Sequence, residues 1–239
     1  MRFSVSACTD VGRKRAANED SYALCEKLGL FAVADGLGGH VAGRRASELG
    51  VGTFVETVGS DPNGHAPGVL RTAFARAGWA IFEAARIDAG LRGMGTTLAA
   101  LWLRGEEAWL AHAGDSRLYL LRAGRLVALT LDHSVVGERV ARGELTIEQA
   151  RIHPGRHVIT RALGVVHGVE PDLSSLRVQA GDVFVLCSDG VSSQMSDAEL
   201  GETIEKGRDL ASAAAALIAL ANARGGDDNA TVILVRLDG

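Results

Sequence analysis

Two apolar runs far apart in the sequence end in the same way, and this shared ending constrains the fold more than any other feature. Residues 31–34 lead into Asp35-Gly36, and residues 183–187 lead through a serine into Asp189-Gly190. Short apolar runs bounded by glycine are typical of buried strands. A carboxylate at the tip of such a strand is costly to bury unless it is protonated, paired or bound to a cation. The sequence therefore predicts two buried strands that each deliver an aspartate.

The periodic segments predict an α+β chain. Residues 3–8, 22–24 and 231–237 read as strands, and four further short strands follow one another between residues 97 and 130. Apolar residues recur with helical spacing within 51–58, 70–81 and 210–221. Consecutive strands favour an antiparallel meander over alternating βαβ units. Because the sequence has no repeat, linker or break in composition, we expect one domain over residues 1–239.

Two capping boxes mark further helices. Residues 134–152 have a polar, helical pattern that includes Thr146-Ile147-Glu148-Gln149, and residues 196–199 open a short helix. We therefore predict a helix over 134–152 and a second helix after Ser196.

The charge and cysteine content exclude several classes of protein. A formal net charge of −4 argues against a surface for nucleic acid or anionic membranes. Three cysteines without C-x-x-C spacing favour a reducing compartment, and Cys187 reads as a core residue. The N-terminus has no signal-peptide pattern, and the longest apolar stretch is too short to span a bilayer. We therefore expect a cytoplasmic protein without membrane insertion.

Five aspartates border apolar runs next to Gly, Asn or Ser. They are Asp20, Asp35, Asp115, Asp189 and Asp228. If these carboxylates gather at one end of the core, their mutual repulsion favours bound cations, and ligands that are all oxygen suit Mg²⁺ or Mn²⁺ better than Zn²⁺. The alternative is that each is an ordinary turn residue. The sequence contains no P-loop, no D-x-D after the first strand, no C-x₅-R loop and no G-x-S-x-G elbow.

Eight motifs together carry a resemblance that covers nearly the whole chain. In order, they are TDVGRKRAANEDSY, FAVADGLGGHVAG, MGTTLAAL, AHAGDSRLYLLRAG, LTLDHS, HPGRHVITRALG, LCSDGVSS and GDDNATVILV. With these motifs the chain resembles the metal-dependent Ser/Thr protein phosphatases of the PPM family, type 2C, in their compact bacterial form. The resemblance implies an αββα sandwich, in which two antiparallel sheets lie face to face with helices outside.

The resemblance also implies a binuclear centre of Mn²⁺ or Mg²⁺. Asp35 would bridge both ions, and the Gly36 carbonyl would bind one of them. Asp189 and Asp228 would bind the other ion, and Asp20 would hold its site by contacts through bound water.

A third, weaker metal site is implied by bacterial relatives, which use the aspartate at Asp115 together with that at Asp189. From the residues alone, a turn role for Asp115 remains the alternative. Residues 134–163 match the family's flap, which would carry partner contacts.

Arg15 matches the family's phosphate-binding arginine, whose planar fork suits phosphate oxygens. Leu37 stands where some members have a histidine, so a general acid at that position is missing. His40 or a metal-bound water is left as the proton donor, and loop packing is the alternative for His40. Arg44, where relatives often have glutamate, changes the charge around the entrance. His153 and His157 are expected to be structural or to lie at the substrate edge.

The function implied is hydrolysis of phosphoserine and phosphothreonine by direct attack of a metal-bridging water, without a phosphoenzyme. We expect a monomer whose partners are phosphoprotein substrates and a cognate bacterial Ser/Thr kinase. The alternatives are a phosphoprotein-binding pseudophosphatase and an anti-anti-sigma-factor phosphatase. The five acids and Arg15 are all retained, which favours an active enzyme.

Overall fold

The computed structural model describes residues 2–166 and 168–238, with the side chains of all of these except His40. Its strands form two sheets in which every pairing is antiparallel. Sheet I contains, in spatial order, β1 (Arg2–Asp10), β11 (Ala230–Asp238), β10 (Val183–Cys187), β7 (Arg117–Arg122) and β8 (Arg125–Ala128). Sheet II contains β2 (Asp20–Cys25), β3 (Leu30–Leu37), β5 (Leu98–Arg104), β6 (Glu107–Ala113) and β9 (Asp172–Arg177), with β4 (Gly95–Thr96) paired to β3.

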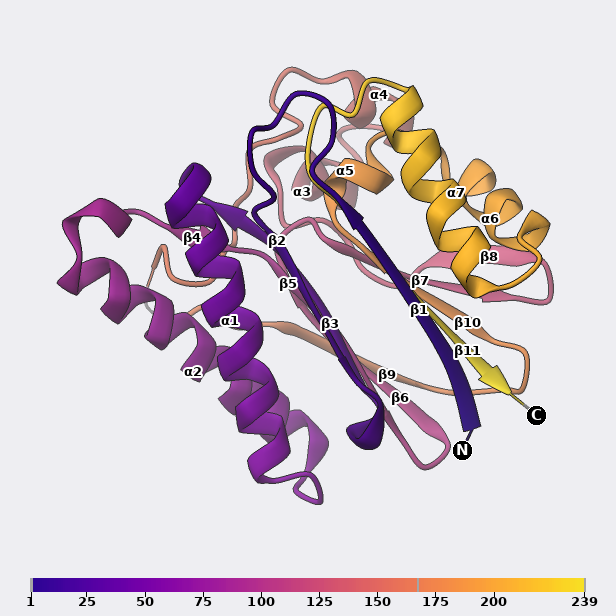
Figure 1. Cartoon of the computed structure of the whole chain (residues 1–239), viewed down its shortest axis with the longest axis horizontal. Coiled ribbons are helices and arrows are strands. Elements are labelled where there is room, and N and C mark those ends of the chain that lie inside the picture. The colour runs from indigo at the N-terminus through magenta and orange to yellow at the C-terminus, as the bar shows by residue number, and fades with distance from the viewer. Residues whose placement is uncertain (1, 167, 239) are drawn as a thin grey trace.

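Helices cover the outer faces of both sheets (Figure 1). Sheet II carries the long helices α1 (His40–Ser60) and α2 (Ala66–Ile87), and sheet I carries α6 (Asp197–Lys206) and α7 (Leu210–Ala223). The shorter helices are α3 (Val135–Ala141), α4 (Ile147–Ile152), α5 (Asp189–Ser192), η1 (Glu26–Leu28) and η2 (Ala89–Leu91).

The core lies in three apolar layers. Phe31 and Leu101 of sheet II pack with Phe184 and Ile233 of sheet I in the space between the sheets. A second cluster fills the space between sheet II and the helices α1 and α2, and a third fills that between sheet I and the helices α6 and α7. Burial of alternate faces of each strand drives this stacking, since each sheet has two apolar faces to cover. The predicted four-layer αββα sandwich is confirmed.

The meander predicted between residues 97 and 130 is wrong as a single sheet. The hairpin β5–β6 belongs to sheet II, whereas the hairpin β7–β8 belongs to sheet I. The chain changes sheet at Gly114, which has φ = +113°. A Cβ at Gly114 would lie 2.5 Å from Cγ2 of Thr97, so only glycine fits this crossing. The crossing leaves Asp115 between the two sheets rather than at the tip of a hairpin.

The single helix predicted over residues 134–152 is also wrong, because the segment forms two helices. Helix α3 ends at Ala141, and Gly143 adopts a left-handed conformation with φ = +72°. Thr146 then opens α4 with the predicted capping box, in which its hydroxyl accepts a hydrogen bond from the Gln149 amide. Here the local start signal at Thr146 marks a new helix and does not lie within a continuous one.

Two local assignments also differ from the sequence. Strand β9 was not predicted, because it is an edge strand whose residues are mostly exposed and show little apolar alternation. Strand β3 continues past Asp35 to Leu37, since β4 pairs with Gly36 and Leu37. Asp35 therefore lies within a strand and not at its tip. The buried Cys187 and the capping box at Ser196 are as predicted.

Candidate metal centre

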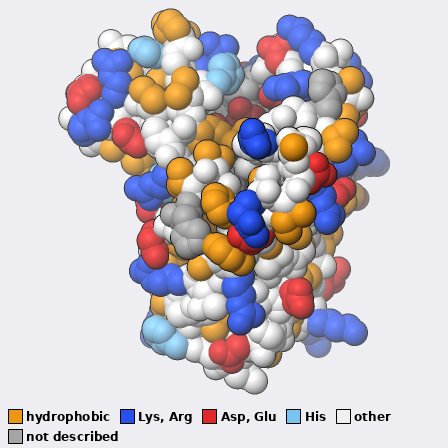
Figure 2. All heavy atoms as spheres, turned by 90° about the vertical axis from the view of Figure 1, so that its left-hand side faces the viewer, with side chains coloured by type: hydrophobic (Ala, Val, Ile, Leu, Met, Phe, Trp, Pro, Cys, Tyr) orange, Lys and Arg blue, Asp and Glu red, His pale blue; other side chains and the backbone are white. Residues whose placement is uncertain are grey.

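The five predicted aspartates come together at one end of the sandwich. They are Asp20 at the start of β2, Asp35 in β3, Asp115 after β6, Asp189 at the start of α5 and Asp228 before β11. Asp20 and Asp35 face each other as register partners of β2 and β3. Figure 1 places α3, α4, α5 and the loop after β1 at this same end. Figure 2 shows that this end of the molecule is divided into two lobes with a hollow between them.

Burial and mutual repulsion make these carboxylates hard to ionise. Burial, with the charges of Asp189 and Asp228, raises the pKa of Asp20 to about 7. Burial, with the charges of Asp189 and Asp132, raises the pKa of Asp115 to about 8. Burial, followed by the charges of the other four aspartates, raises the pKa of Asp35 well above its usual range. Without a counter-ion, this part of the protein therefore holds protons at neutral pH.

Three carboxylate oxygens in this cluster are buried and have no hydrogen-bond partner among the described residues. They are Oδ1 of Asp20, Oδ1 of Asp115 and Oδ1 of Asp189. A buried hydrogen-bond acceptor without a partner is energetically costly. Clustered, negatively charged carboxylate oxygens are the ligands that a hard divalent cation requires. The residues present thus fit one or more Mn²⁺ or Mg²⁺ ions. The assignment of individual ligands stays a prediction.

The second oxygen of Asp20 is held by two hydroxyl groups that the sequence analysis did not single out. Ser188 Oγ donates to Asp20 Oδ2 at 2.7 Å, and Thr231 Oγ1 donates to the same atom at 2.6 Å. These donors come from the ends of β10 and β11, so they join sheet I to the first strand of sheet II. They orient Asp20 so that only Oδ1 remains available. The sequence signal that could have identified Ser188 and Thr231 was their place in the same motifs as Asp189 and Asp228.

The backbone of Asp35 is fixed by the two threonines of the MGTTLAAL motif. Thr97 Oγ1 accepts a hydrogen bond from the Asp35 amide at 2.9 Å, and Thr96 Oγ1 donates to the Asp35 carbonyl at 2.8 Å. Thr97 Oγ1 also lies 2.7 Å from Oγ of Ser116, next to Asp115. This chain of hydrogen bonds sets the position of Asp35 relative to Asp115.

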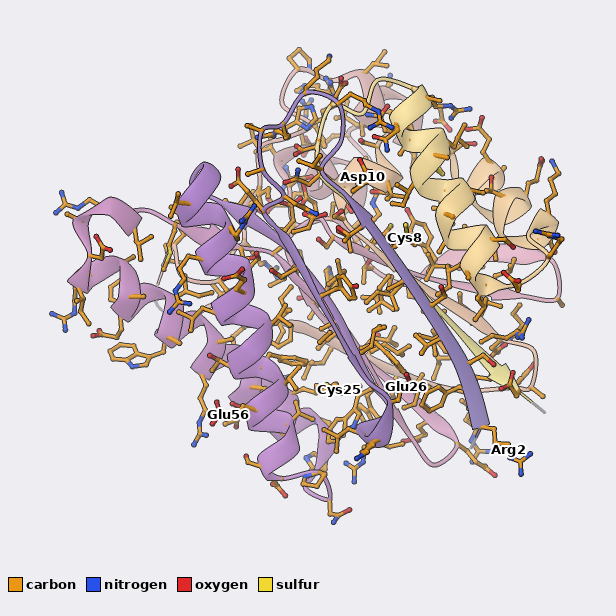
Figure 3. All side chains as sticks on the ribbon, viewed as in Figure 1. Arg2, Cys8, Asp10, Cys25, Glu26 and Glu56 are labelled. Carbon is orange, nitrogen blue, oxygen red and sulfur yellow. The ribbon has the colours of Figure 1, made fainter. Side chains whose placement is uncertain are left out.

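Arg15 lies in the loop between β1 and β2 and pairs with an acid of the cluster. Its guanidinium donates to Asp228 Oδ2 at 2.6 Å, and its side chain is about half exposed. Figure 3 shows Asp10, which caps the start of this loop by accepting from the Gly12 amide at 2.8 Å, at the end of β1 opposite Arg2. The predicted phosphate-binding arginine therefore stands at the mouth of the acid cluster.

Asn229, which the sequence analysis also missed, holds the loop of Arg15 in place. Its buried amide donates to the carbonyls of Val11 and Ala17, both at 2.9 Å, and its Oδ1 accepts from the Glu19 amide at 2.7 Å. The side chain of Asn229, which directly follows Asp228, thereby holds both ends of this loop. Its place in GDDN was the signal.

The other predicted site residues have more limited outcomes. The side chain of His40 lies outside the described part of the structure, so its catalytic role stays a prediction. A Cβ at Gly36 would lie 2.1 Å from the Gly43 carbonyl oxygen, so the strand can pass α1 only with glycine there. The role of the Gly36 carbonyl as a metal ligand also stays a prediction. Arg44 donates to the Asn18 carbonyl at 2.9 Å, close to the Arg15 loop.

A separate polar group lies beneath the turn of Asp115. Among the described residues, His112, His133 and Asp172 have potential ligand atoms within 4.8 Å of one another. The two imidazoles are stacked with centroids 4.4 Å apart and planes at 19°, so the nitrogen lone pairs of the two rings lie in separate, nearly parallel planes and are poorly placed to meet at one ion. His133 Nδ1 accepts from the Gly114 amide at 3.2 Å, and its Nε2 lies 3.1 Å from Asp172. This group supports the Gly114 crossing.

The raised pKa values predict how the stability of the metal-free protein depends on pH. The carboxyls of Asp20 and Asp115 titrate at about 7 and about 8 in the folded chain, against 3.8 ordinarily. Between these values the folded state binds more protons than the unfolded state, so the free energy of unfolding falls as pH rises from about 4 to about 8. We expect the Tm of chelated protein to be about 5–10 °C lower at pH 8 than at pH 5.

Calorimetry of chelated protein over this pH range measures that effect, and Mn²⁺ added at pH 8 should reverse it because the cation replaces the protons. A Tm that rises from pH 5 to pH 8 in the chelated protein would contradict the clustering of these acids.

The known proteins that are similar to this chain are protein phosphatases. The sequence profile of the protein phosphatase 2C family matches residues 12–228. PstP of Mycobacterium tuberculosis, a serine/threonine protein phosphatase, is 41% identical over 229 residues, which cover 96% of this chain and 44% of PstP. PhpP of Streptococcus pneumoniae, a protein phosphatase, is 36% identical over 244 residues, covering 99% of this chain and 98% of PhpP.

A crystal structure of the catalytic domain of PstP in complex with two manganese ions superposes on this fold with a TM-score of 0.90. Its sequence is 38% identical, and the superposition covers 99% of each chain. The chain thus spans less than half of the length of full-length PstP and nearly all of PhpP.

Proposed function

Because this chain belongs to the protein phosphatase 2C family, we propose that it is an active, metal-dependent protein-serine/threonine phosphatase. The observation that carries the proposal is the buried acid cluster with unpartnered oxygens, next to the exposed guanidinium of Arg15. The relatives PstP and PhpP are phosphatases by name, and the solved catalytic domain of PstP binds manganese. The acid set is complete, which favours turnover over the binding-only alternative.

We assign each residue of the centre a part in this reaction. Asp35, Asp189 and Asp228 would hold two divalent cations, and Asp20 would support one of these sites from the rigid position that Ser188 and Thr231 impose. Bound there, such cations lower the pKa of water and offset the charge that builds on a phosphoryl group.

Arg15 would hold the phosphate of the substrate. In the structure it pairs with Asp228, and with Asp228 holding a cation the guanidinium of Arg15 would be free to bind a phosphate. The planar fork then orients the phosphoryl group at the mouth of the cluster.

Asp115 would form a weaker third cation site together with Asp189. Its buried Oδ1 has no partner among the described residues, and its charge acts on Asp35. A site with few protein carboxylates keeps many water ligands and binds weakly, so we expect occupancy only at high concentrations of Mn²⁺ or Mg²⁺.

The substrates we propose are phosphoproteins, which a Ser/Thr kinase must supply because only phosphoryl transfer to a hydroxyl makes these esters.

No described helix is long and apolar enough to cross a membrane. The three cysteines are free, which fits the reducing cytoplasm that we propose. The monomeric state stays a prediction.

The test of this function is hydrolysis under control of the metal. Purified protein should hydrolyse both a phosphothreonine peptide and p-nitrophenyl phosphate with Mn²⁺, lose turnover with a chelator, and regain it when Mn²⁺ returns. Full activity after chelation would contradict the proposal. Tight binding of the phosphopeptide without release of phosphate would instead support the pseudophosphatase.

Replacing Arg15 with alanine should lower kcat/KM for the phosphopeptide by about 10- to 100-fold, because a hydrogen bond to a charged group contributes about 1.5–3 kcal/mol. The kcat/KM of Arg15→Lys should lie between those of Arg15→Ala and the unmodified protein, since lysine keeps the charge but not the planar fork of the guanidinium. The matched control is Arg13→Ala in the same loop, where the side chain is 61% exposed. The cation-induced rise in Tm should persist in all three variants, and its loss in Arg15→Ala would make the residue structural.

A further inference from the structure

A cleft of about 200 Å³ adjoins the metal centre, between the flap (residues 134–163) and sheet I. Asp115 and Asp189 form part of its wall, so the cleft is continuous with the acid cluster. The helices α3 and α4 of the flap form one side, and the segment after β8 together with α5 forms the other.

Part of the wall of the cleft is apolar, and two large side chains in that part are open to solvent. Leu131 on the sheet side is 47% exposed, and Ile147 on α4 is 59% exposed. Val136 and Val140 of α3 and Ala150 of α4 continue this surface. Apolar side chains that stay exposed in a concave site beside a reaction centre are typical of a binding surface.

Several of the polar groups in the wall already have partners within the protein. Asp132 accepts two hydrogen bonds of 2.7 Å from Arg117, and Thr130 Oγ1 accepts from the Leu118 amide at 3.1 Å. Arg151 pairs with Asp197 at 3.4 Å. Asp115 and Asp189, whose Oδ1 atoms have no partner among the described residues, form the part of the wall next to the metal centre, and the exposed side chains of Arg156 and His157 complete it. An apolar group can therefore enter beside Leu131 and Ile147, away from these two carboxylates, without breaking either ion pair.

We propose that this cleft receives an apolar side chain of the substrate polypeptide, within a few residues of the phosphoserine or phosphothreonine. The inference rests on the proposed function, because a phosphate held at the acid cluster and Arg15 forces the flanking chain across the adjoining surface. At about 200 Å³ the cleft is smaller than the 300–1,000 Å³ typical of pockets for whole small molecules, so a single side chain suits it better than a metabolite.

The test uses phosphothreonine peptides that differ at one flanking position at a time, with leucine, alanine or aspartate there. At one position, leucine should raise kcat/KM about tenfold above aspartate, because burying a leucine side chain in an apolar site is strongly favourable. Ile147→Glu, which places a charge on the wall, should bring this ratio close to one. Leu131→Glu, from the opposite wall, should do the same.

Ile152→Glu is the matched control, since Ile152 lies on the same helix, is 81% exposed and is not part of the cleft. It should retain the tenfold ratio. Each peptide rate is divided by the turnover of p-nitrophenyl phosphate by the same protein, which separates peptide recognition from folding and chemistry.

The possible results distinguish this inference from the proposed function. Equal kcat/KM for all peptides in the unmodified protein, or equal effects of Ile147→Glu and Ile152→Glu, would overturn the cleft assignment and leave the phosphatase activity standing. Failure to hydrolyse any of the phosphopeptides would overturn both.

Discussion

Asp189→Asn is expected to lower kcat for phosphopeptide hydrolysis by about 10³-fold, because Asp189 would help to hold a cation that contributes several kcal/mol of charge stabilisation in the transition state. The side chain is buried, its Oδ1 has no partner among the described residues, and it interacts with Asp228 and Asp35. Asparagine keeps the volume but removes the charge that attracts a cation. Initial rates at saturating Mn²⁺ measure the loss of turnover, and titration calorimetry measures the loss of Mn²⁺ binding.

The same variant should change the stability of the metal-free protein in the opposite direction. Removing one charge from a cluster of buried, mutually repelling carboxylates should raise the Tm of chelated Asp189→Asn above that of the unmodified protein by about 5 °C at pH 8. Added Mn²⁺ should then raise the Tm of the variant much less, since a ligand is missing.

Asp227→Asn is the control for this experiment, because Asp227 adjoins Asp228 in sequence but is exposed and pairs with Lys14. It should match the unmodified protein in turnover and in the Mn²⁺-induced shift of Tm. An unchanged Mn²⁺ shift in Asp189→Asn would show that this residue is not a ligand.

Asp115→Asn is expected to lower turnover by about 10²-fold while the fold and the tighter cation binding remain. Asp115 lies in the crossing between the sheets, where it interacts with Asp35 and Asp189, and the third site that we propose depends on its carboxylate. The amide removes that charge, yet the hydrogen bonds around Gly114 and Thr97 do not involve the Asp115 side chain.

Calorimetry with Mn²⁺ separates the two kinds of site in this variant. The tight phase should persist, and a weak phase present in the unmodified protein should disappear. Normal turnover of Asp115→Asn at saturating Mn²⁺ would return Asp115 to the role of a turn residue. Loss of the tight phase would place it among the ligands of the main centre.

Local signals determined most elements of the fold. The apolar runs before Asp35 and Asp189 are buried strands, and Gly225 and Gly226, both with positive φ, follow the end of α7. These features are decided within a few residues, by side-chain burial on one face and by backbone conformations that glycine alone adopts easily. The order of the eight motifs was sufficient to indicate the family, because each motif carries a residue type that its chemistry requires.

The tertiary structure alone decided how these elements meet. The chain changes sheet at Gly114, and the flap breaks at Gly143, where local helical pattern and glycine gave opposing indications. Thr231 donates to Asp20 across 211 positions, and Asn229 ties down a loop more than two hundred residues earlier. The raised pKa values of the acids follow from this convergence, since burial and repulsion depend on distances in space. Spacing along a sequence carries no information on such distances, because they are set only when the two sheets pack around their shared core.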